Sequence, residues 1–157
     1  MRKFPIVLVV DDSEAFRVFF RDVLKRTVKF VRVLEAKDGL EGLKMYLQYK
    51  PDVILLDMKM PKLEGDRVLR AIQNDDANTR VVITSAYVGD QDSINRLMKL
   101  GAFSYLPKPM NRMVLMKTIT DVLNDGRNAD RKKKAKTYKT TIQKKRISNS
   151  FVLNQEF

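Results

Sequence analysis

The chain has 157 residues, of which 44% are hydrophobic, so it is long enough for one globular domain with a real core. It contains no cysteine and no histidine. This excludes disulfides, thiolate nucleophiles, Cys/His zinc sites and Ser-His-Asp triads, and any chemistry must use carboxylates, hydroxyls, lysines or backbone groups.

The positive charge is concentrated near one end of the sequence. Lysines and arginines number 31 against 19 acidic residues, which gives a net charge of +12. Residues 1–126 hold 21 basic and 17 acidic residues, a net +4, whereas residues 127–157 hold 10 and 2, a net +8. Most of the basicity therefore belongs to a tail.

No membrane or secretory segment is visible. The apolar run Ile6 to Val10 is shorter than a signal-peptide core of about 7–15 residues. No stretch approaches the roughly 20 apolar residues of a spanning helix. We therefore expect no transmembrane segment and a cytoplasmic location.

Over residues 1–126, short apolar runs rich in β-branched residues alternate with longer amphipathic stretches, which predicts five strands and five helices. In chain order we expect strand Pro5–Val10, helix Glu14–Arg26, strand Phe30–Ala36, helix Asp38–Gln48, strand Val53–Leu56, helix Glu64–Asn74, strand Arg80–Thr84, helix Asp90–Leu100, strand Phe103–Leu106 and helix Met110–Asn124.

This alternation indicates an α/β fold with a parallel sheet, because each strand must return through a right-handed crossover helix. Helices should then cover both faces of the sheet. The runs Ile6–Val10 and Val53–Leu56 are apolar throughout and should be central strands. Pro107 lacks a backbone N–H and directly follows the fifth run, which suits an edge strand.

Polar residues stand at the ends of four predicted strands: Asp11 and Asp12, Asp57, Thr84 and Ser85, and Lys108. In an open α/β sheet, ligands bind at the carboxyl ends of the strands. If the two central strands are neighbours, three carboxylates meet there, and Lys108 leaves them a formal charge of about −2. A Mg²⁺ ion would neutralise that charge, so the set points to a metal-assisted phosphoryl site with an aspartate as nucleophile.

Over residues 4–125 the chain resembles the receiver domain of bacterial two-component response regulators. Each matching piece is weak alone, but together, in this order and each at a strand end, they are highly specific. The pieces are Asp11-Asp12, Asp57-Met58-Lys59-Met60-Pro61 with Gly65, Thr84-Ser85-Ala86 and Tyr105-Leu106-Pro107-Lys108-Pro109. The resemblance, which is to single-domain chemotaxis-like regulators, implies a flavodoxin-like five-stranded parallel sheet of strand order 2-1-3-4-5. The receiver would span residues 1–126, and residues 127–157 would form a flexible basic extension.

The resemblance also implies roles for single residues. Asp57 would be the phosphoacceptor, Lys108 and Thr84 would contact the phosphoryl oxygens, and Tyr105 would be the switch residue that turns inward as Thr84 moves. Asp11, Asp12, Asp57 and the backbone carbonyl of Lys59 would hold the Mg²⁺ ion. The Lys108-Pro109 peptide bond would be cis.

We therefore expect a phosphorylation-dependent response regulator, not an enzyme that turns over a metabolic substrate, with at most slow self-dephosphorylation. A histidine kinase, a phosphotransfer protein or a small phosphodonor would supply the phosphoryl group. The fourth helix, fifth strand and fifth helix would form the face that a downstream protein target recognises.

Some residues depart from the family pattern, and other interpretations stay open. Lys59 and Ala86 stand where the family tunes water access to the acyl phosphate, and a long lysine there predicts a long-lived phosphorylated state. Pro107 stiffens the strand end beside Tyr105. Asp11-Asp12 also suits an ordinary helix start. A small metal-dependent phosphatase is disfavoured, because Lys59 occupies the position where a general acid would stand.

The tail leaves several functions open. Its basic residues include Arg131-Lys132-Lys133-Lys134 and Lys144-Lys145-Arg146, followed by the apolar Phe151-Val152-Leu153. It is too short for a winged-helix output domain. A solvated extension, salt-dependent nucleic-acid binding, attraction to an anionic membrane and docking of the apolar cluster on the receiver or a partner all remain alternatives.

Overall fold

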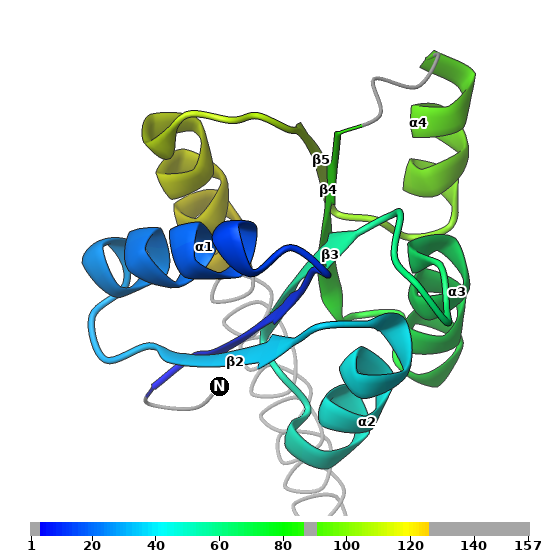
Figure 1. The fold of residues 1–157 in the computed structure, drawn as a ribbon, viewed down its shortest axis with the longest axis horizontal. Helices are drawn as coiled ribbons and strands as arrows, with labels where there is room; N and C mark the ends of the chain where they lie inside the picture. Colours follow the sequence, from blue (N-terminus) through cyan, green and yellow to red (C-terminus); the bar gives the residue numbers. More distant parts are fainter. Residues whose placement is uncertain (1–3, 87–90, 126–157) are drawn as a thin grey trace, which may run out of the picture. The chain divides into compact units, whose positions relative to one another are not determined.

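A computed structural model describes residues 4–86 and 91–125 (Figure 1). Strands and helices alternate along this part of the chain, as the sequence predicts. The strands are β1 (Ile6–Val10), β2 (Arg32–Ala36), β3 (Val53–Asp57), β4 (Arg80–Ser85) and β5 (Ser104–Pro107). The helices are α1 (Glu14–Thr27), α2 (Gly39–Tyr49), α3 (Gly65–Asp75), α4 (Gln91–Lys99) and a last helix described over residues 112–125. The predicted extension, residues 127–157, lies outside the described residues.

All strand pairs are parallel and the order is β2-β1-β3-β4-β5, which confirms the predicted topology. Strands β1 and β3 lie inside the sheet, and every residue of each is buried. This is the burial that their uniformly apolar sequences predict, because such strands are covered on both faces.

Strand β5 is at one edge, but it extends one residue further than predicted. Pro107 is its last residue and pairs with Ser85 of β4. The ladder continues past the missing proline donor because the backbone N–H of Lys108 donates to the Ser85 carbonyl at 2.7 Å.

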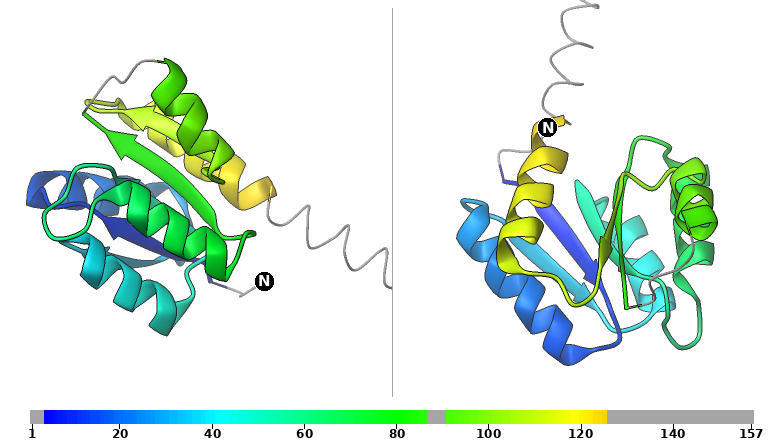
Figure 2. Two further views of the ribbon diagram at one scale, coloured as in Figure 1. Left: turned by 90° about the vertical axis from the view of Figure 1, so that its right-hand side faces the viewer. Right: turned by 90° about the horizontal axis from the view of Figure 1, so that it is seen from above.

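The helices form two layers around the sheet (Figures 1 and 2). The α1 helix and the last helix pack on one face, with Val7 and Val9 of β1 in their core. The other three helices pack on the opposite face, where Leu8 and Val10 of the same strand point. None of the described helices is long and apolar enough to cross a bilayer.

Several element boundaries differ from the predicted ones. Phe30, expected in a strand, has φ 59° and is 67% exposed, because the chain turns there after α1 and β2 begins only at Arg32. Asp38 and Glu64, expected as the first residues of helices, are N-caps with extended backbone. The Asp38 carboxylate accepts a hydrogen bond from the Glu41 N–H at 2.9 Å, as a capping side chain does.

Candidate functional site

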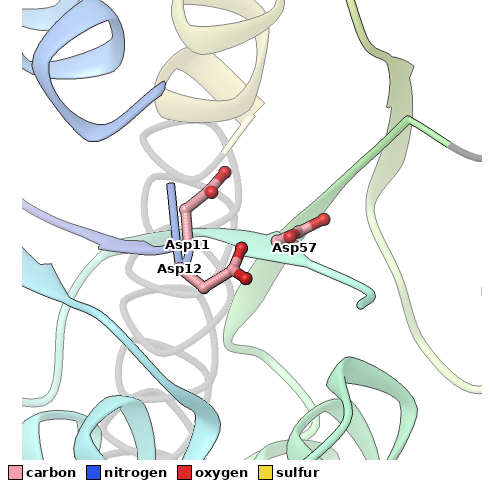
Figure 3. A group of neighbouring side chains, drawn as sticks. All are labelled: Asp11, Asp12 and Asp57. Atoms are coloured by element: carbon pink, nitrogen blue, oxygen red, sulfur yellow. The ribbon is translucent and has the colours of Figure 1, made fainter. Parts of the chain in front are cut away.

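The sheet brings three carboxylates together at the carboxyl ends of two neighbouring strands (Figure 3). Asp11 and Asp12 follow β1, and Asp57 is the last residue of β3. Each offers a carboxylate oxygen that lies within 4.8 Å of the other two. Asp11 and Asp57 are buried and Asp12 is exposed. The predicted convergence of the three acids is therefore present.

The start of α1 holds the first two acids in place. Ser13 is the N-cap of α1, and its N–H donates to Oδ1 of Asp11 at 2.9 Å. One turn later the Arg17 guanidinium donates to the backbone carbonyls of Asp11 at 2.8 Å and Asp12 at 3.2 Å. The helix-start interpretation of this segment is thus correct for Ser13, and it coexists with the acidic cluster. Arg17 was not among the predicted site residues.

Lys108 supplies the positive charge of the cluster from the end of β5. Its buried Nζ lies 2.5 Å from Oδ2 of Asp11 and 3.4 Å from Oδ1 of Asp57. The ammonium also stands 4.2 Å from the centre of the Phe16 ring, a favourable cation–π contact. The peptide bond between Lys108 and Pro109 is cis, as expected. One ammonium against three carboxylates leaves the site acidic.

The burial of Asp57 and its charged neighbours determine the pKa of its carboxyl. Desolvation raises the pKa of its carboxyl above the usual value, the Lys108 charge opposes that change, and the Asp11 charge adds to it. Additional positive charge at the cluster would lower this pKa and favour the ionised carboxylate. A cation at the cluster would supply it.

Thr84 lies beside Asp57 on the neighbouring strand and is fully buried. Its hydroxyl finds no hydrogen-bond partner among the residues that the structure describes. Buried polar groups in proteins are nearly always paired, so this unpartnered hydroxyl is available to a ligand at the cluster. The sequence pattern placed Thr84 at the site but did not show that its hydroxyl lacks a protein partner.

The donor set fits Mg²⁺, a hard cation that prefers oxygen ligands and carboxylates. Asp11, Asp12 and Asp57 offer such oxygens in one place. Lys59 lies in the loop after β3 with an exposed side chain, and the role of its backbone carbonyl as a ligand stays a prediction.

Tyr105 is half-buried on β5, and burial raises the pKa of its phenol. It lines a pocket of about 220 Å³ together with Lys59, Ser85 and Leu97. Tyr105 thus shares this pocket with Lys59 of the loop that follows Asp57 and with Leu97 of helix α4. Its role as a switch stays a prediction.

Comparison with known proteins agrees with this geometry. Residues 7–120 match the family described as the response regulator receiver domain. The chemotaxis protein CheY of Halobacterium salinarum is 33% identical over 117 residues, which cover 74% of this chain and 95% of that protein. The chemotaxis protein CheY of Bacillus subtilis is 30% identical over 118 residues, which cover 75% and 97%.

Solved structures show the same fold. A response regulator receiver domain protein from Clostridium thermocellum superimposes with a TM-score of 0.72 at 32% identity, over 80% of this chain and 98% of that one. The signal receiver domain of a putative Luxo repressor protein from Vibrio parahaemolyticus gives a TM-score of 0.75 at 28% identity, over 80% and 95%. Because the family match spans most of the chain and includes the acidic cluster, the chain belongs to the response regulator receiver domain family and is a CheY-like phosphoacceptor, not a catalytic enzyme.

Proposed function

We propose that the chain is a phosphorylation-dependent response regulator that accepts a phosphoryl group on Asp57 with Mg²⁺ and then changes its affinity for a downstream protein. The observation that carries this proposal is the meeting of three carboxylates, a buried ammonium and an unpartnered buried hydroxyl at one end of the sheet.

The surroundings of the three acids favour Asp57 as the acceptor. Both oxygens of Asp11 are engaged at close range, one by the Ser13 N–H at 2.9 Å and the other by Lys108 at 2.5 Å. Asp12 is exposed, so water solvates its carboxylate. Asp57 is buried, and its Oδ1 lies 3.4 Å from the Lys108 ammonium, farther than the 2.5 Å that separates this ammonium from Asp11, so Lys108 holds the Asp57 carboxylate less tightly.

The chemistry is an in-line phosphoryl transfer. An Asp57 oxygen attacks phosphorus and forms a new P–O bond, while the bond to the donor breaks and the donor keeps the electron pair. Lys108, next to Asp57, would pair with one phosphoryl oxygen, and the Thr84 hydroxyl would donate to another. A Mg²⁺ ion held by Asp11, Asp12, Asp57 and the Lys59 carbonyl would neutralise charge on the phosphoryl oxygens.

Binding of Thr84 to the phosphoryl group would then be transmitted to Tyr105. Ile83, which precedes Thr84, pairs with Tyr105 in the sheet, so movement of Thr84 changes the space beside the phenol. The expected partner face consists of α4, β5 and the last helix. It exposes Met98, Met113 and Val114, which are 40%, 72% and 44% exposed. The upstream partner would be a histidine kinase or a phosphotransfer protein.

The test is phosphorylation with acetyl phosphate and MgCl₂, followed by the intact mass of the protein. We expect the wild-type chain to gain one phosphoryl group and the Asp57→Asn variant to gain none. Asp121→Asn is the control, because Asp121 lies on the last helix and pairs with Lys117 at 2.9 Å. Equal labelling of wild type and Asp57→Asn contradicts the assignment of the acceptor, as does a wild-type chain that takes no label.

A second candidate function is direct nucleic-acid binding through residues 127–157, which the local net charge of +8 favours. Such binding releases counterions and weakens steeply with salt. Titration of the full chain against labelled DNA at low and high salt tests it, with neutralised Arg131, Lys132, Lys133 and Lys134 as the comparison. Absent or salt-independent binding contradicts it.

A further inference from the structure

The loop over residues 58–64, between β3 and α3, follows the proposed phosphoacceptor directly. Its base is closed by a hydrogen bond from the Gly65 N–H to the Met58 carbonyl at 3.0 Å. A Cβ atom at Gly65 would lie 2.3 Å from the Asp57 carbonyl, so only glycine allows this approach. The base of the loop is therefore fixed by its own backbone.

The tip of the loop holds an unfavourable backbone conformation. Lys62 has φ 68°, in the left-handed region that a lysine rarely adopts. The N–H of Leu63 donates to the Pro61 carbonyl at 2.8 Å, which closes a three-residue turn around Lys62. Such a conformation persists only where the surroundings hold it.

The surroundings of this tip are the start of helix α2. The Lys62 ammonium donates to Oδ2 of Asp38 at 2.6 Å, and the Asp38 side chain is only 5% exposed. Its other oxygen caps α2 through the Glu41 N–H. These bonds hold the pKa of the Asp38 carboxyl below its usual value, which favours the charged form that pairs with Lys62. A Cβ at Gly39 would lie 2.3 Å from the Leu63 carbonyl, so loop and helix are in direct contact.

We propose that Asp38 and Lys62 are positioning residues for the cation site: their ion pair holds the loop over residues 58–64 against α2 and so fixes the backbone that follows Asp57. The inference rests on the proposed function, in which the carbonyl of Lys59, three residues before Lys62, is a metal ligand. Groups that hold the ligands of a metal in place contribute to its affinity without touching it.

A positioning role and a purely electrostatic role predict opposite effects of replacing Lys62 on the affinity for Mg²⁺. Removing a positive charge near an acidic cluster should strengthen cation binding if only the Coulomb attraction changes. If the ion pair positions the loop, the same substitution should weaken cation binding. The sign of the change therefore separates the two explanations.

The variants can be matched closely. Lys62→Asn removes the ammonium but keeps a residue that tolerates the left-handed conformation, and Lys62→Arg restores the cation. Asp38→Asn removes the charge and keeps a good helix cap. Lys50→Asn is the control, because Lys50 also has a left-handed backbone, at φ 45°, and also forms a 2.6 Å ion pair, with Asp75.

The experiment is an NMR titration of the amide groups of the full chain with MgCl₂, with thermal unfolding of each variant alongside. We expect Lys62→Asn and Asp38→Asn each to raise the Mg²⁺ dissociation constant about tenfold. The double variant should bind Mg²⁺ no more weakly than either single variant, because both substitutions break the same ion pair. Lys62→Arg and Lys50→Asn should bind Mg²⁺ like the wild type. If Asp38→Asn unfolds, Lys62→Asn decides alone, since the Lys62 side chain is 58% exposed.

Unchanged or tighter Mg²⁺ binding in Lys62→Asn overturns the inference, as does an equal loss in Lys50→Asn. Failure of the proposed function has a different signature. A wild-type chain that binds Mg²⁺ but takes no phosphoryl group from acetyl phosphate contradicts that function, while the Mg²⁺ constants of the variants still decide the role of the pair.

Discussion

Lys108 and Asp11 form a buried ion pair between residues 97 positions apart in sequence, with Nζ and Oδ2 separated by 2.5 Å and side chains only 4% and 1% exposed. The pair joins the end of β5 to the end of β1, although two strands lie between them. Asp11 belongs to the acidic cluster and Lys108 also contacts Asp57 of that cluster, so the pair couples the stability of the fold to the charge of the site.

This coupling predicts the behaviour of Lys108→Met. The variant leaves the buried carboxylates of Asp11 and Asp57 without their counter-charge, and breaking a buried pair in this way costs about 3–5 kcal/mol. We expect the free energy of unfolding in EDTA to fall by about 3 kcal/mol. Because the cluster is then more negative, Mg²⁺ should stabilise the variant more than the wild type.

Chemical unfolding in EDTA and in MgCl₂ measures both effects. Lys117→Met is the control, since the Lys117 side chain is 80% exposed and pairs with Asp121 away from the cluster. Its free energy of unfolding should hardly change. An equal stabilisation of wild type and Lys108→Met by Mg²⁺ would show that Lys108 does not balance the charge of the site.

Thr84→Val should slow phosphorylation without lowering the free energy of unfolding. The substitution removes a buried hydroxyl that has no partner among the described residues, so the free energy of unfolding should stay the same or rise by up to about 1 kcal/mol. The rate of phosphorylation should fall about tenfold or more, because a donor to the phosphoryl oxygens is lost. Thermal unfolding and acetyl phosphate labelling measure the two quantities.

Thr27→Val provides the opposite pattern as a control. The Thr27 hydroxyl donates to the Val23 carbonyl at 2.7 Å on α1, so its loss should destabilise the fold slightly. Its phosphorylation rate should be unchanged. A Thr84→Val variant that is destabilised but labels at the wild-type rate would assign Thr84 to the fold and not to the site.

The parts of the fold that the sequence predicted are those set by local pattern. The uniformly apolar β1 and β3 identified the central strands, and parallel strands bring their carboxyl ends together, so Asp11, Asp12 and Asp57 could be expected to meet. The chain turn at Phe30 was missed, because a left-handed φ at a phenylalanine has no sequence signal.

The ion pair between Asp38 and Lys62 could also not be predicted from the sequence. The two residues are 24 positions apart, and their contact depends on a left-handed lysine at the tip of a loop. The unpartnered state of the Thr84 hydroxyl likewise depends on what surrounds it in three dimensions. Sequence periodicity reports which face of an element is buried, but it carries no information on such side-chain pairings.

Lys59→Asn tests the expected lifetime of the phosphorylated state. Lys59 stands two residues after Asp57 and lines the pocket that contains Tyr105 and Ser85. A long side chain there should hinder the approach of water to the acyl phosphate, so the shorter asparagine should accelerate dephosphorylation about threefold, equivalent to about 0.65 kcal/mol in the barrier. Loss of the phosphoryl mass with time measures the rate. An unchanged rate contradicts shielding by Lys59.

The ionisation of Asp75, which is not part of the acidic cluster, should make the stability of the fold depend on pH. Its Oδ2 accepts hydrogen bonds from the Tyr46 hydroxyl and the Lys50 ammonium, both at 2.6 Å. The Lys50 bond, followed by the Tyr46 bond, holds the pKa of the Asp75 carboxyl below its usual value. A depressed carboxyl pKa stabilises the folded state above the unfolded pKa of about 3.9, and that stabilisation is lost as the pH falls through the folded pKa.

Lys50→Met should therefore raise the pKa of Asp75 toward its usual value and shift the acid unfolding of the chain to higher pH. Carboxyl ¹³C NMR measures the pKa directly. Because the Asp75 side chain is 45% exposed, added salt should screen the Lys50 contribution in the wild type and leave the Tyr46 hydrogen bond in place. High salt should then move the Asp75 pKa of the wild type part of the way toward its value in Lys50→Met. If the Asp75 pKa responds neither to salt nor to the Lys50→Met substitution, the ion pair does not form in solution.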